Sequence, residues 1–189
     1  MKKLPLWTAV LLGGGMLTPT AIAVEGLSAN IGATNNYLWR GVTQTEDKAA
    51  FSGGIDYDFG NGLSVGTWAS NVQFGDDSHT ELDWYAGYGF EFGDVTLDVG
   101  YIYYAYPDTD GSDFSEVNLT FGWNFLSVGI STLADSDWDS DFADDTYVEA
   151  NLAFEVAKEM ELGIHFGSYD FDSGTDYQDY NISLSKSGF

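Results

Sequence analysis

The sequence predicts an all-β protein, and more narrowly a transmembrane antiparallel up-and-down β-barrel of about ten strands. Three observations indicate this fold class. Apolar and polar residues alternate along most of the chain, short and long connections alternate, and the chain begins with an export signal. The aromatic content agrees with this, because 6 Trp, 12 Tyr and 13 Phe suit strands and membrane interfaces.

The first 23 residues predict a cleaved signal peptide. Lys2 and Lys3 form its positive start, residues 4–17 form its apolar part, and Ala21-Ile22-Ala23 is the small-x-small cleavage site. The alternative is a membrane anchor, but the apolar stretch is short for a spanning helix, which needs about 20 residues. We therefore expect residues 24–189 to form an outer-membrane β-barrel domain.

Alternation with a period of two is the main secondary-structure signal. In residues 49–59, for example, Phe51, Ile55 and Tyr57 lie on one side and Asp56 and Asp58 on the other, which is typical of a strand with one apolar and one polar face. The same pattern predicts strands over residues 25–39, 47–59, 63–74, 79–91, 94–105, 113–124, 126–133, 145–155, 160–170 and 177–188.

The connections predict how the strands are oriented. Arg40–Glu46 would close the first hairpin, and the other connections form a short and a long class. The short ones lie at residues 60–62, 92–93, 124–125 and 157–159, and the longer acidic ones at 75–78, 106–112, 134–144 and 171–176. Short turns at one end and longer loops at the other are typical of outer-membrane barrels, whose long loops face outside the cell.

A soluble secreted β-sandwich that binds carbohydrate is an alternative, because its strands also have one polar and one apolar face. The predicted strands mostly approach the 9–11 residues that a tilted membrane strand needs, whereas soluble strands average about five or six. Trp68 and Tyr85, predicted to point inward, could contact a sugar or simply fill a narrow lumen.

Three stretches of the first half resemble a known family. They are residues 37–45 (YLWRGVTQT), 66–72 (GTWASNV) and 81–88 (ELDWYAGY), together with 54–57 (GIDY). In these stretches the chain resembles the TorF-like family of proteobacterial outer-membrane porins. The resemblance covers much of residues 25–100, and it implies export, a barrel fold and a role in transport without naming a solute.

The polar face of the strands predicts the lining of a lumen. Glu81, Asp83, Glu116 and Glu149 would lie near the outer mouth, where Arg40, the only arginine, would pair with carboxylates as a clamp or contact a ligand. Rings of carboxylates favour cations, although a narrow barrel can also be filled by polar side chains without a path. The predicted lining is Arg40, Asp56, Asp58, Trp68, Glu81, Asp83, Tyr85, Glu91, Asp98, Glu116, Glu149, Glu155, Glu161 and His165.

These features predict an outer-membrane porin that passes ions or small solutes and prefers cations. The alternative is a closed barrel with a structural or surface-interaction role. Expected partners are outer-membrane lipid, the barrel-assembly machinery and small solutes or cations, whereas a net charge of −24 excludes nucleic acid.

We expect no catalysis and no cofactor, because the sequence has neither a G-x-S-x-G nor an H-E-x-x-H motif and His165 is the only histidine predicted to point inward. The acidic loops offer weak calcium candidates, since the complete EF-hand spacing is missing. These candidates are Asp108, Asp110, Asp135 and Asp137.

Overall fold

The computed structural model describes residues 24–138 and 140–187, so the predicted signal peptide lies outside the described residues. Ten long strands form one sheet, and two short strands, β2 (Leu38–Trp39) and β3 (Val42–Thr43), form a separate hairpin. The long strands are β1 (Leu27–Thr34), β4 (Ala50–Asp58), β5 (Leu63–Asn71), β6 (Thr80–Phe92), β7 (Val95–Ala105), β8 (Phe114–Trp123), β9 (Leu126–Ser136), β10 (Thr146–Ala157), β11 (Met160–Asp170) and β12 (Tyr177–Lys186). None of the described residues belongs to a helix long and apolar enough to cross a membrane.

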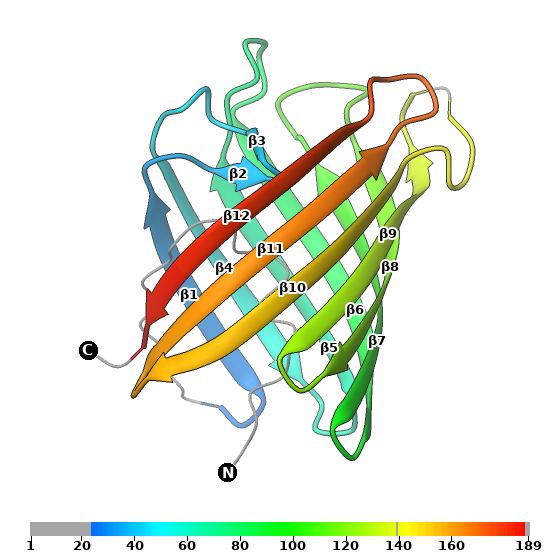
Figure 1. Ribbon diagram of the computed structural model, residues 1–189. Helices are drawn as coiled ribbons and strands as arrows, with labels where there is room; N and C mark the ends of the chain where they lie inside the picture. The colour runs from blue at the N-terminus through cyan, green and yellow to red at the C-terminus, as the bar shows by residue number, and fades with distance from the viewer. Residues whose placement is uncertain (1–23, 139, 188–189) are drawn as a thin grey trace.

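The long strands follow one another around the sheet in chain order. Their spatial order is β1-β4-β5-β6-β7-β8-β9-β10-β11-β12, and every neighbouring pair is antiparallel. This confirms the prediction of about ten antiparallel up-and-down strands. Figure 1 shows the sheet curling into a wall that runs from β1 around to β12, and β1 and β12 are the two edges of the sheet.

Connections of two lengths lie at opposite ends of the sheet, as predicted (Figure 1). The short turns use the left-handed backbone region that tight hairpins require. Gly93 has a φ of 68° between β6 and β7, and Asn124 and Glu159 have φ of 52° and 60° in two other short turns. The longer connections all lie at the other end, which we call the loop end.

The two faces of the sheet differ in chemistry in the way the alternation predicts. One row across five strands, Tyr57-Val65-Ala86-Tyr101-Val117, lies on the outward face. The neighbouring row, Asp56-Gly66-Tyr85-Ile102-Glu116, lies on the inward face. Large apolar side chains on the outward face stay exposed, and the buried acidic side chains all lie on the inward face.

The first connection departs from the prediction. Strand β1 ends at Thr34 instead of continuing to residue 39, and residues 35–49, which we call the inserted segment, contain the β2–β3 hairpin. Tyr37 of this segment is buried against Trp68, with ring centroids 5.4 Å apart. The predicted simple hairpin was therefore wrong, because the aromatic side chains of this segment pack inside the curled sheet.

The inserted segment completes a hydrophobic core in the loop-end half of the molecule. Its buried members are Tyr37, Ala50, Trp68, Val72, Ile102, Tyr104 and Tyr106, with Trp39, Tyr85 and Phe114 packed against them. We call this group the aromatic core. Unlike the core of a two-layer protein, it lies within the curve of a single sheet.

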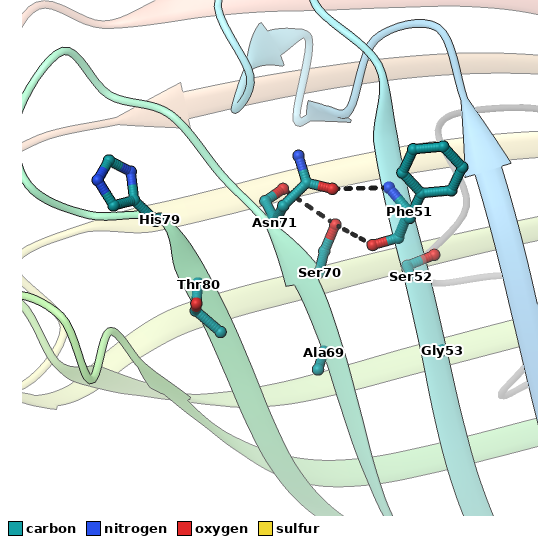
Figure 2. Close-up of a pocket in the computed structure, with 8 residues that line it drawn as sticks. All are labelled: Phe51, Ser52, Gly53, Ala69, Ser70, Asn71, His79 and Thr80. Atoms are coloured by element: carbon teal, nitrogen blue, oxygen red, sulfur yellow. Dashed lines mark hydrogen bonds between the residues drawn. The ribbon is translucent and has the colours of Figure 1, made fainter.

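A shallow depression lies at the loop ends of β4, β5 and β6, near Phe51, Asn71 and His79 (Figure 2), and its volume is about 290 Å³. Here the Asn71 side chain continues the strand pairing, because its Oδ1 accepts from the Phe51 backbone N–H at 2.7 Å and its Nδ2 donates to the Ala49 carbonyl at 3.2 Å. The amide of Asn71 is thus already satisfied, and none of the carboxylates of the inward face lines the depression.

Candidate functional site

Arg40 occupies the tight turn of the β2–β3 hairpin, where its φ is 48°. The hairpin projects its guanidinium across the interior to Glu116 on β8, and the two N–H···O distances are 2.6 and 2.7 Å. Both side chains are buried, with exposed fractions of 9% for Arg40 and 3% for Glu116. The pair is therefore a bidentate, charge-assisted contact of the strong kind.

Aromatic rings surround the same guanidinium. Its Cζ lies 4.3 Å from the ring centre of Trp39, 4.4 Å from that of Tyr147 and 5.0 Å from that of Tyr169. Burial alone lowers the pKa of Arg40, but the Glu116 carboxylate outweighs burial and raises this pKa above its ordinary value. Arg40 thus stays charged and joins the inserted segment to β8, β10 and β11.

A second buried group consists of two acids on the inward face of β6. The Glu81 carboxylate accepts from the Tyr37 hydroxyl at 2.8 Å and from the Tyr106 hydroxyl at 3.2 Å. Burial, followed by the charge of Glu81, raises the pKa of Tyr37 well above its ordinary value, so this hydroxyl remains a donor. Asp83, two residues further along, is 0% exposed, and neither of its carboxylate oxygens has a hydrogen-bond partner.

A third polar group joins β10, β11 and β12. His165 contacts Asp179 Oδ1 through Nε2 at 2.9 Å and Asn151 Oδ1 through Nδ1 at 2.6 Å. The Tyr147 hydroxyl donates to Asp179 Oδ2 at 2.9 Å, and Glu149 lies 3.7 Å from the imidazole. His165 thus joins the inward faces of β10, β11 and β12 through both of its ring nitrogens.

Of the fourteen predicted lining residues, ten lie inside the curled sheet in several groups, and four are exposed. Arg40, Trp68, Glu81, Asp83 and Glu116 come together in and around the aromatic core. Tyr85, at the margin of that core, donates to Asp56 at 2.5 Å. Asp98 is buried on β7. Glu149 and His165 belong to the third polar group. The remaining acids, Asp58, Glu91, Glu155 and Glu161, are exposed near the short turns.

Sequence reasoning placed Arg40 inside, but for a wrong reason. Its side chain was assigned by parity to the first strand, whereas Arg40 lies in a turn six residues beyond the end of β1. The aromatic partners Tyr37, Tyr104 and Tyr106 were missed. Continuing the parity of Asp98 along β7 would have placed Tyr104 inward, but the burial of Tyr37 depends on the inserted segment and has no comparable signal.

The acidic loops do not form a metal centre within the described residues. No group of three or more His, Cys, Asp or Glu side chains there could hold a metal ion. Among the candidates, Asp108 accepts from the His79 backbone N–H at 3.2 Å, while Asp110, Asp135 and Asp137 are exposed. The calcium candidates are thus dispersed in the structure.

Together, the fold and these groups define a class of protein: a curled antiparallel sheet with an apolar outward face and buried charges within. The chain belongs to the Gcw_chp family, bacterial proteins of unknown function, whose family model matches residues 20–188. No curated protein matches the chain in sequence.

Among solved structures, the chain is similar to the outer membrane channel DcaP of Acinetobacter baumannii. The sequence identity is 15% and the TM-score is 0.41. The similarity covers 91% of this chain and 62% of that one, so this chain spans less than two thirds of the length of the channel.

Proposed function

We propose that the chain is a bacterial outer-membrane β-barrel of the porin type that passes small cations. The observation that supports this most directly is the contrast between its two faces. Ile31, Phe51 and Ile182 are 67%, 70% and 75% exposed on the outward face, while acids are buried on the inward face. Exposed apolar area is unfavourable in water by about 25 cal/mol per Å², and a bilayer removes this penalty.

Outward aromatic pairs near the short turns add to this argument. Tyr57 and Phe59 have ring centroids 4.7 Å apart, and Phe125 and Phe154 have centroids 5.1 Å apart. Further towards the loop end, Trp84 and Tyr103 form another outward pair. Aromatic girdles at both interfaces are typical of membrane barrels, so the two groups fit a band of lipid between them.

The proposal includes closure of the sheet by pairing of β1 with β12. Unpaired edge N–H and C=O groups in hydrocarbon cost several kcal/mol each, and β1 and β12 run antiparallel to one another around the sheet. Pairing Ile31 with Ile182 or with Leu184 keeps apolar residues outward in either register.

The proposed partners are outer-membrane lipid, the barrel-assembly machinery and small cations; no catalysis, cofactor or nucleic acid is involved. Membership of the TorF-like group is part of the same proposal.

The preference for cations follows from the inward charges. Ten inward carboxylates were predicted, and Arg40 is the only permanent cation among the predicted lining residues. Arg40 is moreover neutralised by Glu116. A negative lumen with low-dielectric walls concentrates cations and excludes anions.

The aromatic core favours a second candidate, a closed barrel with a structural or surface role. Tyr37, Trp68 and Tyr104 fill the loop-end half, and Arg40 crosses it. These residues narrow the interior at the level of the inserted segment. The difference between the two candidates is thus whether ions cross the aromatic core.

Planar-bilayer recordings of the purified, refolded chain test the proposal. We expect discrete conductance steps and a reversal potential in a KCl gradient that indicates cation preference. Glu155→Gln with Glu161→Gln should weaken this preference, because both acids lie at the short-turn mouth, while Asp110→Asn in an exposed loop serves as the control. Anion preference would refute the charge argument, and absence of any conductance would favour the closed barrel.

Closure is tested by a separate experiment with engineered cysteine pairs. The chain has no cysteine of its own, so any disulfide must join the two engineered residues. Ile31→Cys combined with Ile182→Cys or with Leu184→Cys should form an intramolecular disulfide in one of the two registers. Ile31→Cys with Ser183→Cys is the control, since the two side chains would point to opposite faces. Crosslinked dimers, or equal yields from all three pairs, would contradict closure. Solubility without detergent would contradict the membrane location and would indicate a secreted soluble protein instead.

A further inference from the structure

A row of four aromatic rings crosses the loop end of the molecule. Consecutive ring centroids in this row are 5.6, 6.4 and 5.6 Å apart. The row, which we call the aromatic row, consists of Phe74 in the β5–β6 loop, Tyr106 in the β7–β8 loop, Phe114 at the start of β8 and Trp138 in the β9–β10 loop. Both of its ends reach solvent, because Phe74 and Trp138 are 41% and 42% exposed.

The aromatic row covers the interior of the curled sheet. Phe114 lies on the inward face of β8, opposite Tyr104 of β7. The Tyr106 hydroxyl donates to the buried Glu81 at 3.2 Å. The two exposed rings at the ends of the row pack against Tyr106 and Phe114. They therefore lie over the aromatic core at the loop end, and their free faces are available to a solute that approaches from that end.

The loops that carry the row are acidic. In sequence, the β5–β6, β7–β8 and β9–β10 loops contain neither Lys nor Arg. Exposed aspartates lie within three residues of both exposed rings, namely Asp76, Asp77 and Asp137. Lys48 of the inserted segment contacts the β5–β6 loop at Gln73, but its charge is paired with Glu46. Because the face of an aromatic ring is also negative, rings and carboxylates together attract a cation.

The interior beneath the row already holds a cation of one particular chemistry, the guanidinium of Arg40. Trp39 packs against Phe114 with ring centroids 6.3 Å apart, and the Arg40 Cζ lies 4.3 Å from the centre of the Trp39 ring. A continuous series of ring contacts thus leads from the exposed Trp138 to this guanidinium. A guanidinium is planar and more weakly hydrated than an ammonium, so it stacks on aromatic faces.

We propose that the aromatic row binds the guanidinium group of a small solute at the loop end. The exposed faces of Phe74 and Trp138 supply cation–π attraction, and the neighbouring aspartates supply the opposite charge, which are the two kinds of partner that Arg40 has inside. This inference rests on the proposed function and deepens it, because it names the class of cation that the chain collects.

The composition of the row disfavours other ligands. Ca²⁺ takes six to eight oxygen ligands, and the part of the chain that the structure describes has no group of acidic or imidazole side chains that could hold a metal ion. A neutral sugar can stack on the same rings but gains nothing from the charge of the loops. A planar organic cation is favoured by both the rings and the charge.

Ligand-observed NMR of the purified chain in detergent tests the site without requiring conductance. The probe is methylguanidinium chloride, whose methyl protons report saturation transfer from the protein, and N-methylurea is the neutral control of similar shape. We expect transfer to methylguanidinium and much less to N-methylurea at equal ionic strength. Phe74→Leu and Trp138→Leu should each raise the Kd of methylguanidinium about two- to fivefold, as expected for one exposed cation–π contact. Phe142→Leu is the matched control, because Phe142 is 67% exposed in the same loop as Trp138 but lies outside the row.

Three outcomes of this titration would overturn the inference. Equal transfer to both probes would mean that the row offers only apolar contact. A Kd that stays unchanged when Phe74→Leu and Trp138→Leu are combined would place the cation elsewhere. An equal loss of affinity in Phe142→Leu would mean that any exposed ring of the loops binds the probe.

Reversal potentials separate this inference from the proposed function. With methylguanidinium chloride opposite KCl across a planar bilayer, we expect methylguanidinium to carry current. Binding that depends on the row, in a conducting chain that does not pass methylguanidinium, would overturn the small solute and favour an arginine side chain of a partner protein. The same binding in a chain without any conductance would refute the porin proposal and leave the site standing. Cation-selective conductance without binding that depends on the row would leave the porin proposal standing and refute the site.

Discussion

Removing the buried Arg40 guanidinium should destabilise the chain more than removing any exposed cation. Arg40→Met keeps much of the side-chain length but leaves Glu116 buried without its partner at 2.6 Å. Breaking a buried pair in this way costs about 3–5 kcal/mol. The loss of the contacts with Trp39, Tyr147 and Tyr169 acts in the same direction, since a desolvated cation–π contact can contribute about 2 kcal/mol.

The assay is equilibrium unfolding by urea in lipid vesicles, followed by tryptophan fluorescence. Lys48→Met is the matched control, because it removes the same charge from an exposed pair with Glu46 at 3.0 Å, and such pairs contribute about 0–1 kcal/mol. In the double variant Arg40→Met/Glu116→Leu, the two changes should be less than additive, since neither charge remains. An Arg40→Met variant within about 0.5 kcal/mol of wild type would refute the view that this pair holds the inserted segment.

Three further predictions concern the sheet itself. Leu119→Arg should impair insertion, because a cation on the outward face near the midplane costs roughly 2–4 kcal/mol. The control Ser127→Arg places the same charge on the inward face and should insert. Equal yields of the two variants in an outer-membrane fraction would mean that the faces are misassigned. A tag in the loop at Asp110 should bind antibody on intact cells and a tag at Asn61 should not, and labelling at Asn61 would reverse the orientation. Gly66→Ala should lower the Tm, because a Cβ there would collide with the Tyr85 ring and with Asp56 Oδ1, and an unchanged Tm would contradict this close approach.

Most of the sheet could be predicted from the sequence because a single constraint acts on every strand. In a strand, every second side chain lies on the same face. Because the outward face is apolar in every strand, an alternation of apolar and polar residues marks each strand in the sequence. The predicted strand over residues 160–170 coincides with β11, and that over 63–74 differs from β5 only at its end. The largest difference is at the end of β1, which stops at Thr34 where the inserted segment begins. Strand β5 stops at Asn71, whose side chain takes over the pairing with residues 49 and 51.

The site could be predicted only where it follows from the same parity. Glu81, Asp83 and Glu116 were placed inward correctly because each lies in a regular strand. Parity gives no distances between strands, so it could not show that Glu116 contacts Arg40 whereas Asp83 has no hydrogen-bond partner. That difference depends on how the inserted segment folds back, which is a tertiary property of residues 35–49.

The inserted segment also explains how one connection can both fill the interior and link the two edges of the sheet. It leaves β1 directly, and its Gly41 approaches β12 so closely that a Cβ there would lie 2.5 Å from the Asp179 Cβ. Gly41 has a φ of 79°, a conformation that glycine adopts readily. Asp179 is itself held by His165 at 2.9 Å. The contacts of Gly41 and Arg40 therefore hold the inserted segment, which follows β1 in the chain, against β12 and against β8, β10 and β11 at the loop end. The two edges of the sheet are thus linked through this segment, and the proposed pairing of β1 with β12 would add to that link.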